Sequence, residues 1–143
     1  MLIFVGDGPY IGELKERCPD ALYVGYKTAS ELSEYYANAD LLVFHSLTET
    51  FGNVTLESLS SVLPVLCFDT AAAKELVIDG ENGFTVNVFQ DKAFVDKAIQ
   101  IFDHLDLGNI RNKARRTAEQ NCWEQIIRRT EKEFMDVFNV TKK

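Results

Sequence analysis

The sequence predicts an α/β fold with a parallel sheet, and three observations support it. Short apolar segments alternate with segments whose apolar residues recur at helical spacing. The apolar segments contain few polar residues, as expected of strands that are covered on both faces. Glycine or aspartate follows three of them, at Gly6, Gly25 and Asp69, and marks the end of each strand. With right-handed crossovers, this alternation predicts a Rossmann-like, doubly wound parallel sheet of about five strands.

The predicted strands and helices of the first part of the chain follow one another in turn. The strands are expected at residues 2–5, 21–24, 41–44, 64–68 and 84–88. The helices between them are expected at residues 10–17, 30–38, 54–61 and 71–78. A turn at Gly6-Asp7-Gly8-Pro9 ends the first strand, and Asp79-Gly80 ends the fourth helix.

After residue 90 the pattern changes, and only helices are predicted. Apolar spacing indicates one helix around residues 93–102, a second over 110–121 and a third over 123–140. Trp123 is expected to be a packing anchor. Residues 90–143 are thus predicted to form the helical tail of a single domain that spans residues 1–143.

Composition and charge limit the class of protein. A chain of 143 residues with 46% hydrophobic and 26% charged residues is typical of one soluble globular domain. The net charge of −7 argues against nucleic acid as a partner, because binding to phosphates needs a basic surface. Three cysteines without a C-x-x-C pair favour neither a disulfide framework nor a zinc site, so a reducing cytoplasm is expected, with Cys67 in the core.

Ligands of doubly wound sheets bind at the carboxyl ends of the strands. The loops at residues 6–9, 25–29, 45–53 and 69–73 are therefore the candidate ligand-binding segments. Gly6 and Gly8 resemble the start of a G-x-G-x-x-G motif, but Ile11 stands where the third glycine should be. A nicotinamide-dependent oxidoreductase is therefore kept only as a disfavoured alternative.

The segment SLTETFGNVTLE, residues 46–57, contains two carboxylates eight positions apart, Glu49 and Glu57. Asn53 is a suitable N-cap for a helix that starts at Val54. The start of a helix offers backbone N–H groups to a phosphate, and Gly52 allows the backbone to approach a ligand closely. Carboxylates on both sides could accept hydrogen bonds from hydroxyl groups, which suits a sugar nucleotide. Taken singly, each glutamate could also be a solvated surface acid.

This segment resembles the E-x7-E motif of retaining glycosyltransferases of family 4, the group 1 glycosyl transferases with the two-domain GT-B fold. Six more segments resemble that family's motifs in order: FVGDGP (4–9), YVGY (23–26), YYANADLLVFHS (35–46), LPVLCFD (63–69), KELVIDGENGFTV (74–86) and CWEQI (122–126). The resemblance covers nearly the whole chain. It implies the carboxyl-terminal, donor-binding domain of such an enzyme.

The resemblance implies roles for particular residues. Glu49 would be the catalytic residue, because it would contact the donor sugar close to the reacting carbon. Glu57 would bind the ribose of the nucleotide, and the loop at Tyr26 would flank the base. Four residues would touch the sugar and the phosphates through their backbone: Phe51, Gly52, Asn53 and Val54.

The implied reaction is transfer of a hexose from a nucleoside diphosphate sugar, with retention of configuration and without a metal or another cofactor. The implied partners are the nucleotide sugar and an amino-terminal acceptor domain, and the full-length enzyme would associate peripherally with a membrane. The expected location is the cytoplasm. The chain would lack the first strand of its domain as well as the acceptor domain, so it is expected to be inactive by itself.

Some residues depart from the family pattern. Val62 and the pair Ala71-Ala72 stand where glycines are usual, and His45 replaces a common proline. A β-branched residue is poorly suited to the left-handed conformation that often closes a helix. These departures keep open a second hypothesis, a non-catalytic Rossmann-like module or a truncated partner subunit.

Overall fold

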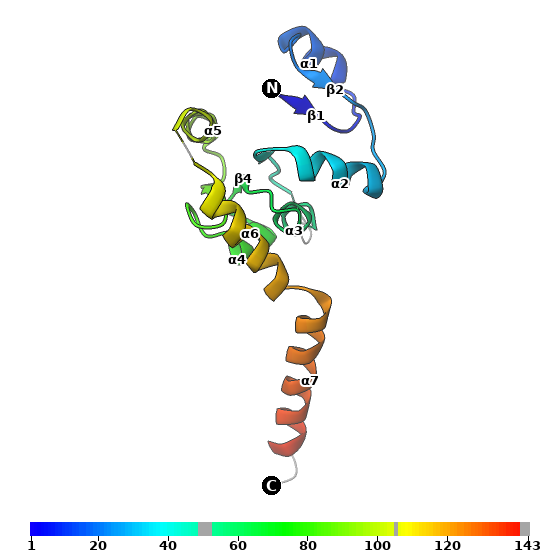
Figure 1. The fold of residues 1–143 in the computed structure, drawn as a ribbon, viewed down its shortest axis with the longest axis vertical. Coiled ribbons are helices and arrows are strands. Elements are labelled where there is room, and N and C mark those ends of the chain that lie inside the picture. The colour runs from blue at the N-terminus through cyan, green and yellow to red at the C-terminus, as the bar shows by residue number, and fades with distance from the viewer. Residues whose placement is uncertain (49–52, 105, 141–143) are drawn as a thin grey trace. The chain divides into compact units, whose positions relative to one another are not determined.

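The computed structural model describes residues 1–48, 53–104 and 106–140, and this part of the chain holds five strands and seven helices (Figure 1). It divides into two compact units, Met1–Asn38 and Ala39–Lys143. Neighbouring strands pair in parallel in both units, which confirms the predicted α/β fold. The predicted strands and helices are all present, with ends shifted by only a residue or two.

The first unit is a β-α-β-α segment. Strand β1 (Ile3–Phe4) pairs with β2 (Leu22–Tyr23), helix α1 (Ile11–Arg17) connects them, and α2 (Ala29–Asn38) follows. The ring of Tyr23 stacks on Phe4 with centroids 5.0 Å apart, and its hydroxyl donates to the carbonyl oxygen of Leu14 at 2.7 Å. This tyrosine therefore joins the helix to the two strands.

Helix α2 starts with a capping box formed by Thr28 and Glu31. The Glu31 carboxylate accepts hydrogen bonds from the backbone N–H of Thr28 at 2.9 Å and from its hydroxyl at 2.7 Å. The backbone N–H of Glu31 donates to the Thr28 hydroxyl oxygen at 3.4 Å. Two donors at the start of the helix are thus satisfied reciprocally, which explains why α2 begins at Ala29.

The second unit contains a three-stranded ladder in the order β3 (Leu42–Phe44), β4 (Val65–Phe68) and β5 (Phe84–Val86). All four residues of β4 are buried. Side chains alternate between the faces of a strand, and here they enter two different clusters. Val65 and Cys67 belong to one cluster, whereas Leu66 and Phe68 belong to the other. The central strand is therefore covered on both faces, as the sequence predicts.

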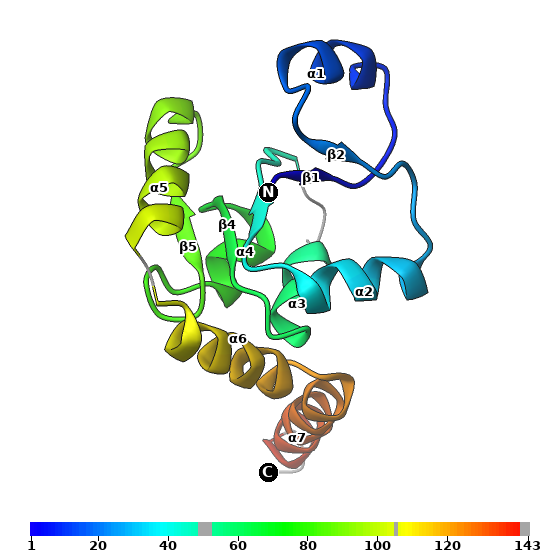
Figure 2. The ribbon, with the colours of Figure 1, turned by 45° about the horizontal axis from the view of Figure 1, so that its top comes forward.

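Five helices surround or follow this ladder: α3 (Asn53–Ser60), α4 (Ala71–Leu76), α5 (Asp91–His104), α6 (Gly108–Gln120) and α7 (Trp123–Val140). Residues of α3, α4 and α6 pack with Val65 and Cys67, and residues of α5 pack with Leu66 and Phe68. Figure 2 shows α5 on one side of β4 and β5, and α3 and α4 on the other. Helices thus lie on both faces of the ladder, the doubly wound arrangement.

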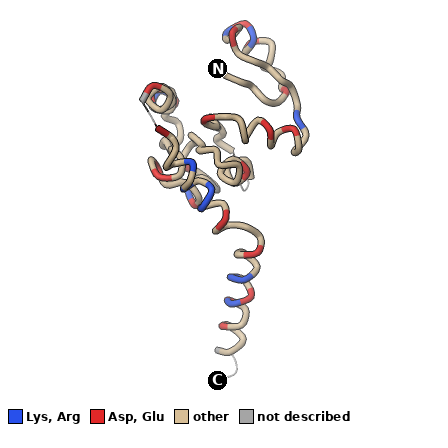
Figure 3. The backbone as a smooth tube through the Cα atoms, viewed as in Figure 1, with Lys and Arg blue, Asp and Glu red and all other residues tan. Residues whose placement is uncertain are grey.

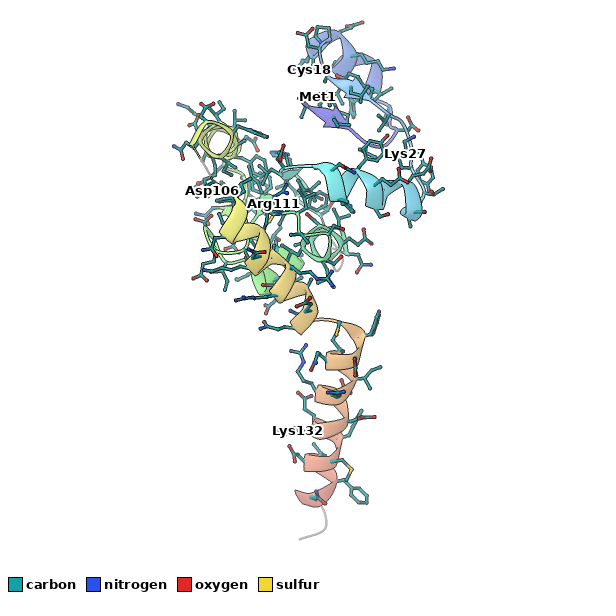
Figure 4. All side chains as sticks on the ribbon, viewed as in Figure 1. Met1, Cys18, Lys27, Asp106, Arg111 and Lys132 are labelled. Carbon is teal, nitrogen blue, oxygen red and sulfur yellow. The ribbon has the colours of Figure 1, made fainter. Side chains whose placement is uncertain are left out.

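Arginines of α6 tie this helix to the rest of the second unit. The Arg111 guanidinium, labelled in Figure 4, donates to the carbonyl oxygen of Ala39 and lies 3.4 Å from the Asp40 carboxylate. The Arg115 guanidinium donates to the carbonyl oxygen of Ser60, the last residue of α3, at 2.6 Å. Helix α6 is therefore held both at the start of the ladder and at the end of α3.

The connection between α4 and β5 is organised by a buried asparagine. Asn82, which is 3% exposed, accepts a hydrogen bond from the backbone N–H of Ile78 at 2.7 Å. Its amide nitrogen donates to the Leu76 carbonyl oxygen and to the Thr117 hydroxyl, both at 2.8 Å. The next residue must be glycine, because a Cβ at Gly83 would lie 2.9 Å from the carbonyl oxygen of Val65.

Most residues of helix α7 are exposed, and Figure 3 shows acidic and basic residues close together on it. The expectation that Trp123 is a packing anchor is wrong, because its side chain is 79% exposed. The chain turns at Asn121 and Cys122, after the last buried residue of α6, so Trp123 does not reach either core cluster. No helix in the described ranges is long and apolar enough to cross a membrane.

Candidate functional site

The carboxyl ends of β3, β4 and β5 lie at one edge of the ladder, because these strands are parallel and in register. Phe44 at the end of β3 pairs with Cys67, and Phe68 at the end of β4 pairs with Val86. The chain leaves β3 at His45 and returns to the ladder through α3. This edge is where a doubly wound fold places its ligands.

Three predicted site residues lie on α3. Asn53 is the first residue of the helix and is exposed, Val54 is half-buried, and Glu57 is exposed in the second turn. Asn53 and Glu57 are four positions apart, so both point to the same face of the helix. The inward face of α3 is fixed by Thr55, Ser58 and Leu59. These last three residues are each no more than 2% exposed.

The start of α3 differs slightly from the prediction. Asn53 was expected to be the N-cap, but it is already helical, and Glu57 therefore lies one residue deeper in the helix. The first turn of a helix leaves backbone N–H groups without intrahelical partners, which makes Asn53 and Val54 suitable neighbours for an anion. The predicted residues Glu49, Phe51 and Gly52 lie outside the described residues, so their roles stay predictions.

Tyr26 belongs to the first unit and is 75% exposed. Its backbone N–H donates to the carboxylate of Asp7 at 2.8 Å, and the N–H of Gly6 donates to the Gly25 carbonyl oxygen at 2.9 Å. These contacts join the loops that follow β1 and β2, both predicted to be ligand-binding segments. Gly25 has a φ of +69°, a conformation that favours glycine.

The sequence did not assign a role to Asp7, although it fixes the backbone of Tyr26. The two residues are 19 positions apart, and no local pattern joins them. A usable signal was the position of Asp7 in the turn that follows the first strand. A carboxylate at the end of a parallel strand often binds backbone N–H groups of the neighbouring loop.

His45, which replaces a proline common in the family, has several neighbours in the structure. Its ring lies edge-on to Phe68 and to Phe94, with centroids 4.7 and 4.9 Å apart. Its Nε2 atom lies 3.0 Å from the Asp91 carboxylate at the start of α5. The side chain is nevertheless 48% exposed, so the ring is both fixed and accessible.

The backbone takes the left-handed conformation at Val62 (φ 62°) and at Ala71 (φ 46°), where the resemblance predicts glycines. Val62 follows the end of α3, and Ala71 follows Thr70 near the carboxyl end of β4. The local conformation typical of glycine is thus kept although the glycines are absent. Residues other than glycine adopt this conformation at a cost.

A hollow of about 410 Å³ lies between α6 and α7, away from the residues predicted to bind ligand. It is lined by Arg116, Glu119, Gln120, Gln125 and Arg129. These side chains are all exposed, and two of them are engaged elsewhere. Arg129 donates to Asn121, and Glu119 pairs with Arg115 at 2.8 Å. The carboxyl edge of the ladder remains the better candidate because of its topology.

Among the described residues, no group of three His, Cys, Asp or Glu side chains could hold a metal ion.

A family model described as glycosyl transferases group 1 matches residues 1–104, which include the carboxyl edge and α3. The chain belongs to this family. The match extends through β5 and α5, and it contains every predicted site residue.

Curated relatives of the family support the assignment over almost the whole chain. A GDP-mannose-dependent alpha-mannosyltransferase of Corynebacterium glutamicum is 27% identical over 143 residues, which cover 99% of this chain and 35% of the relative. The sulfoquinovosyl transferase SQD2 of Arabidopsis thaliana is 31% identical over 128 residues, which cover 85% and 25%. The chain therefore spans about a third or less of the length of these relatives.

Solved structures show the same fold. A sucrose-phosphate synthase from Thermosynechococcus elongatus aligns with a TM-score of 0.79 and 21% identity over 97% of this chain and 39% of that one. The pneumococcal O-GlcNAc transferase GtfA, in complex with UDP and GlcNAc, aligns with a TM-score of 0.76 and 22% identity over 95% and 29%. These similarities confirm the predicted fold, which is that of GT-B glycosyltransferases.

Proposed function

We propose that this chain is the donor-binding part of a retaining glycosyltransferase, which transfers a hexose from a nucleoside diphosphate sugar to an acceptor. The observation that carries the proposal is the start of α3, where Asn53 and Glu57 share an exposed face beside the first N–H groups of the helix. Membership of the glycosyltransferase family supports it. One relative is named for GDP-mannose, and a related structure holds UDP and glucose.

In this proposal the helix start faces the diphosphate. Backbone N–H groups around Asn53 and Val54, with Phe51 and Gly52 before them, would stabilise the negative charge that develops on the leaving diphosphate. Such preorganised donors do not need to rotate when the charge forms. This route needs no metal ion, and metal-independent transfer is part of the proposal.

The two glutamates take different parts of the ligand. Glu57 would accept hydrogen bonds from the ribose hydroxyls, and Glu49 would orient the sugar on the face where the acceptor attacks. Transfer on that face retains the configuration of the sugar carbon. Tyr26 would lie beside the base.

The three free cysteines suit the reducing cytoplasm that we propose as the location.

Binding to the isolated chain tests the proposal. We expect UDP, GDP or one of their sugars to perturb the ¹H–¹⁵N NMR signals of Asn53, Val54 and Glu57. Glu57→Ala should weaken binding by roughly tenfold, the loss expected for hydrogen bonds to a charged group. Glu133→Ala, at an exposed glutamate of α7, is the matched control and should bind as the wild type does.

A second candidate function is a non-catalytic partner subunit. The replacement of the usual glycines by Val62 and Ala71 favours it, because both residues hold the left-handed conformation at a cost that glycine would avoid. The same titration separates the two functions, since a module that has lost its site would bind no nucleotide sugar.

The family assignment leaves the oxidoreductase alternative without support. Hydrolysis of a nucleotide sugar by the chain alone should be undetectable, as expected for part of an enzyme.

A further inference from the structure

His45 occupies a defined place at the carboxyl edge of the ladder. It is the first residue after β3, and its ring reaches past Phe68, the last residue of β4, to the start of α5. Phe68 and Phe94 are 1% and 3% exposed, so the ring lies against two buried side chains. Asp91 holds Nε2 at 3.0 Å. Three contacts from two other elements therefore fix the orientation of the imidazole.

The contact with Asp91 also determines which nitrogen carries the proton. An ionised carboxylate can only accept a hydrogen bond, so Nε2 must donate. In the neutral ring Nδ1 then has a free lone pair and is an acceptor. Nδ1 has no hydrogen-bond partner among the described residues. A half-exposed ring therefore presents an oriented acceptor at the edge where ligands of this fold bind.

We infer that His45 is a ligand-binding residue of the donor site, whose Nδ1 accepts a hydrogen bond from a hydroxyl group of the nucleotide sugar while Asp91 holds the ring. The inference rests on the proposed function and adds a residue that the E-x7-E motif does not contain. A hydroxyl is the expected donor because a phosphate oxygen offers no proton to Nδ1 and would be repelled by the Asp91 carboxylate.

A purely structural role explains these contacts less well. An exposed contact between polar side chains contributes little to stability, and the exposed fractions here are 48% for His45 and 75% for Asp91. An apolar ring would pack against Phe68 and Phe94 without a polar atom to satisfy. The pair does, however, preorganise a polar ligand contact, which lowers the cost of binding.

Two substitutions of His45 separate the roles of its nitrogens. Glutamine can place its amide nitrogen near the position of Nε2 and keep the bond to Asp91, but it has no acceptor at Nδ1. Asparagine can place an acceptor near Nδ1 but does not reach Asp91. We expect His45→Ala and His45→Gln to weaken binding about tenfold, and His45→Asn to restore part of the affinity.

The measurement is calorimetric titration of the full chain with UDP-glucose, UDP, GDP-mannose and GDP. Loss of affinity only for the sugar nucleotide assigns the hydroxyl to the sugar, and loss for the nucleoside diphosphate as well assigns it to the ribose. Lys97→Ala is the matched control. Like Asp91, Lys97 lies on α5 and pairs with a residue outside this helix, Asp79 at 3.1 Å. Asp79 precedes β5 in the chain, so this pair does not lie at the carboxyl end of the strand. Its affinity should equal that of the wild type.

The inference and the proposed function fail in different ways. If the wild type binds one of these nucleotides but His45→Ala and His45→Gln bind it equally well, the inference is wrong and the proposed function stands. If the wild type binds none of them, both are wrong. Because His45→Gln keeps the bond to Asp91, it tests the idea even if His45→Ala does not fold. An Nδ1–H tautomer of His45, seen in ¹⁵N NMR of the free chain, would also overturn it.

Discussion

Leu63 and Ser58 exchange two hydrogen bonds across the end of α3. The backbone N–H of Leu63 donates to the Ser58 carbonyl oxygen at 3.0 Å, and the Ser58 hydroxyl donates to the Leu63 carbonyl oxygen at 2.8 Å. The N–H of Val62 donates to the Leu59 carbonyl oxygen at 3.2 Å. These bonds form a Schellman motif with Val62 at the position that glycine normally occupies. The motif closes the helix that carries the proposed donor site.

Val62→Gly should stabilise the protein. A β-branched residue in the left-handed conformation costs roughly 1–2 kcal/mol, and part of this gain is offset because glycine is more flexible in the unfolded chain. We expect a net gain of about 1 kcal/mol in urea unfolding. Val95→Gly, in the middle of α5 where glycine is unfavourable, should instead destabilise. Equal effects of the two substitutions would contradict the role of the φ angle of Val62.

Asn82→Ala should destabilise the second unit by roughly 2–3 kcal/mol. The substitution leaves the backbone N–H of Ile78 and the carbonyl of Leu76, both partly buried, without the buried Asn82 side chain as their partner, and each unsatisfied group is costly. Asn38→Ala is the control, because Asn38 is exposed and its amide donates one hydrogen bond among the described residues, to the Glu34 carbonyl oxygen at 2.8 Å. That substitution should change the free energy of unfolding by less than about 0.5 kcal/mol.

The three free cysteines should differ sharply in reactivity. Burial, and to a smaller extent the negative charge of Asp69, raises the pKa of the Cys67 thiol to about 12. The reactive thiolate of Cys67 is therefore nearly absent at neutral pH, whereas Cys122 is exposed. Labelling with a thiol reagent, followed by mass spectrometry, should modify Cys122 first and Cys67 only after unfolding. Rapid labelling of Cys67 in the folded chain would show that the core opens locally.

The same raised pKa predicts a loss of stability in alkali. The folded state holds the Cys67 proton more tightly than the unfolded state, so the stabilisation is complete below the ordinary pKa of 9.0 and is lost as the pH rises towards 12. Urea unfolding between pH 8 and pH 11 should therefore show stability that falls with pH. The fall should be shallower in Cys67→Ala.

The capping box of α2 predicts the opposite dependence in acid. The hydrogen bonds from the backbone and the hydroxyl of Thr28, and to a smaller extent Lys27, lower the pKa of Glu31 below its ordinary value of 4.5. The carboxylate thus stabilises the folded state at higher pH, and this contribution is lost as the pH falls through the lowered pKa. NMR titration of the Glu31 side chain should give a lower pKa in the wild type than in Thr28→Ala. Equal values would rule out the Thr28 hydroxyl as a cause of the lowered pKa and leave the backbone N–H of residue 28 as the cause.

The strands and helices could be predicted because their signals are local. The four residues of β4 are all apolar since the strand is buried on both faces. The departures from the family pattern could also be identified, and Val62 and Ala71 are indeed strained positions. Predictions failed where tertiary packing decides. Trp123 has a large, mostly apolar side chain of the kind that often packs in a core, but its helix starts beyond the core.

The candidate site was only partly predictable for the same reason. The sequence could place Asn53, Val54 and Glu57 together because they are close in sequence and lie on one helix, and their roles stay predictions. The bonds from Asp7 to Tyr26 and from His45 to Asp91 join residues 19 and 46 positions apart. Such pairs depend on how parallel strands bring their loops together, and a single sequence does not reveal which partner each side chain will meet.

The burial of helix α6 determines where a shortened form of this protein can end. The family match ends at residue 104, yet Ala114 of α6 is 0% exposed, and Ile110 and Ala118 are almost as deeply buried in the two core clusters. A recombinant fragment that ends at residue 104 would lack α6, so the face of the ladder that packs against α3 would become more exposed. It would also lose the hydrogen bond from Arg115 to the Ser60 carbonyl oxygen at the end of α3. The end of the family match therefore does not mark the end of the packed core, and expression designs should retain at least residues 39–120 of the second unit.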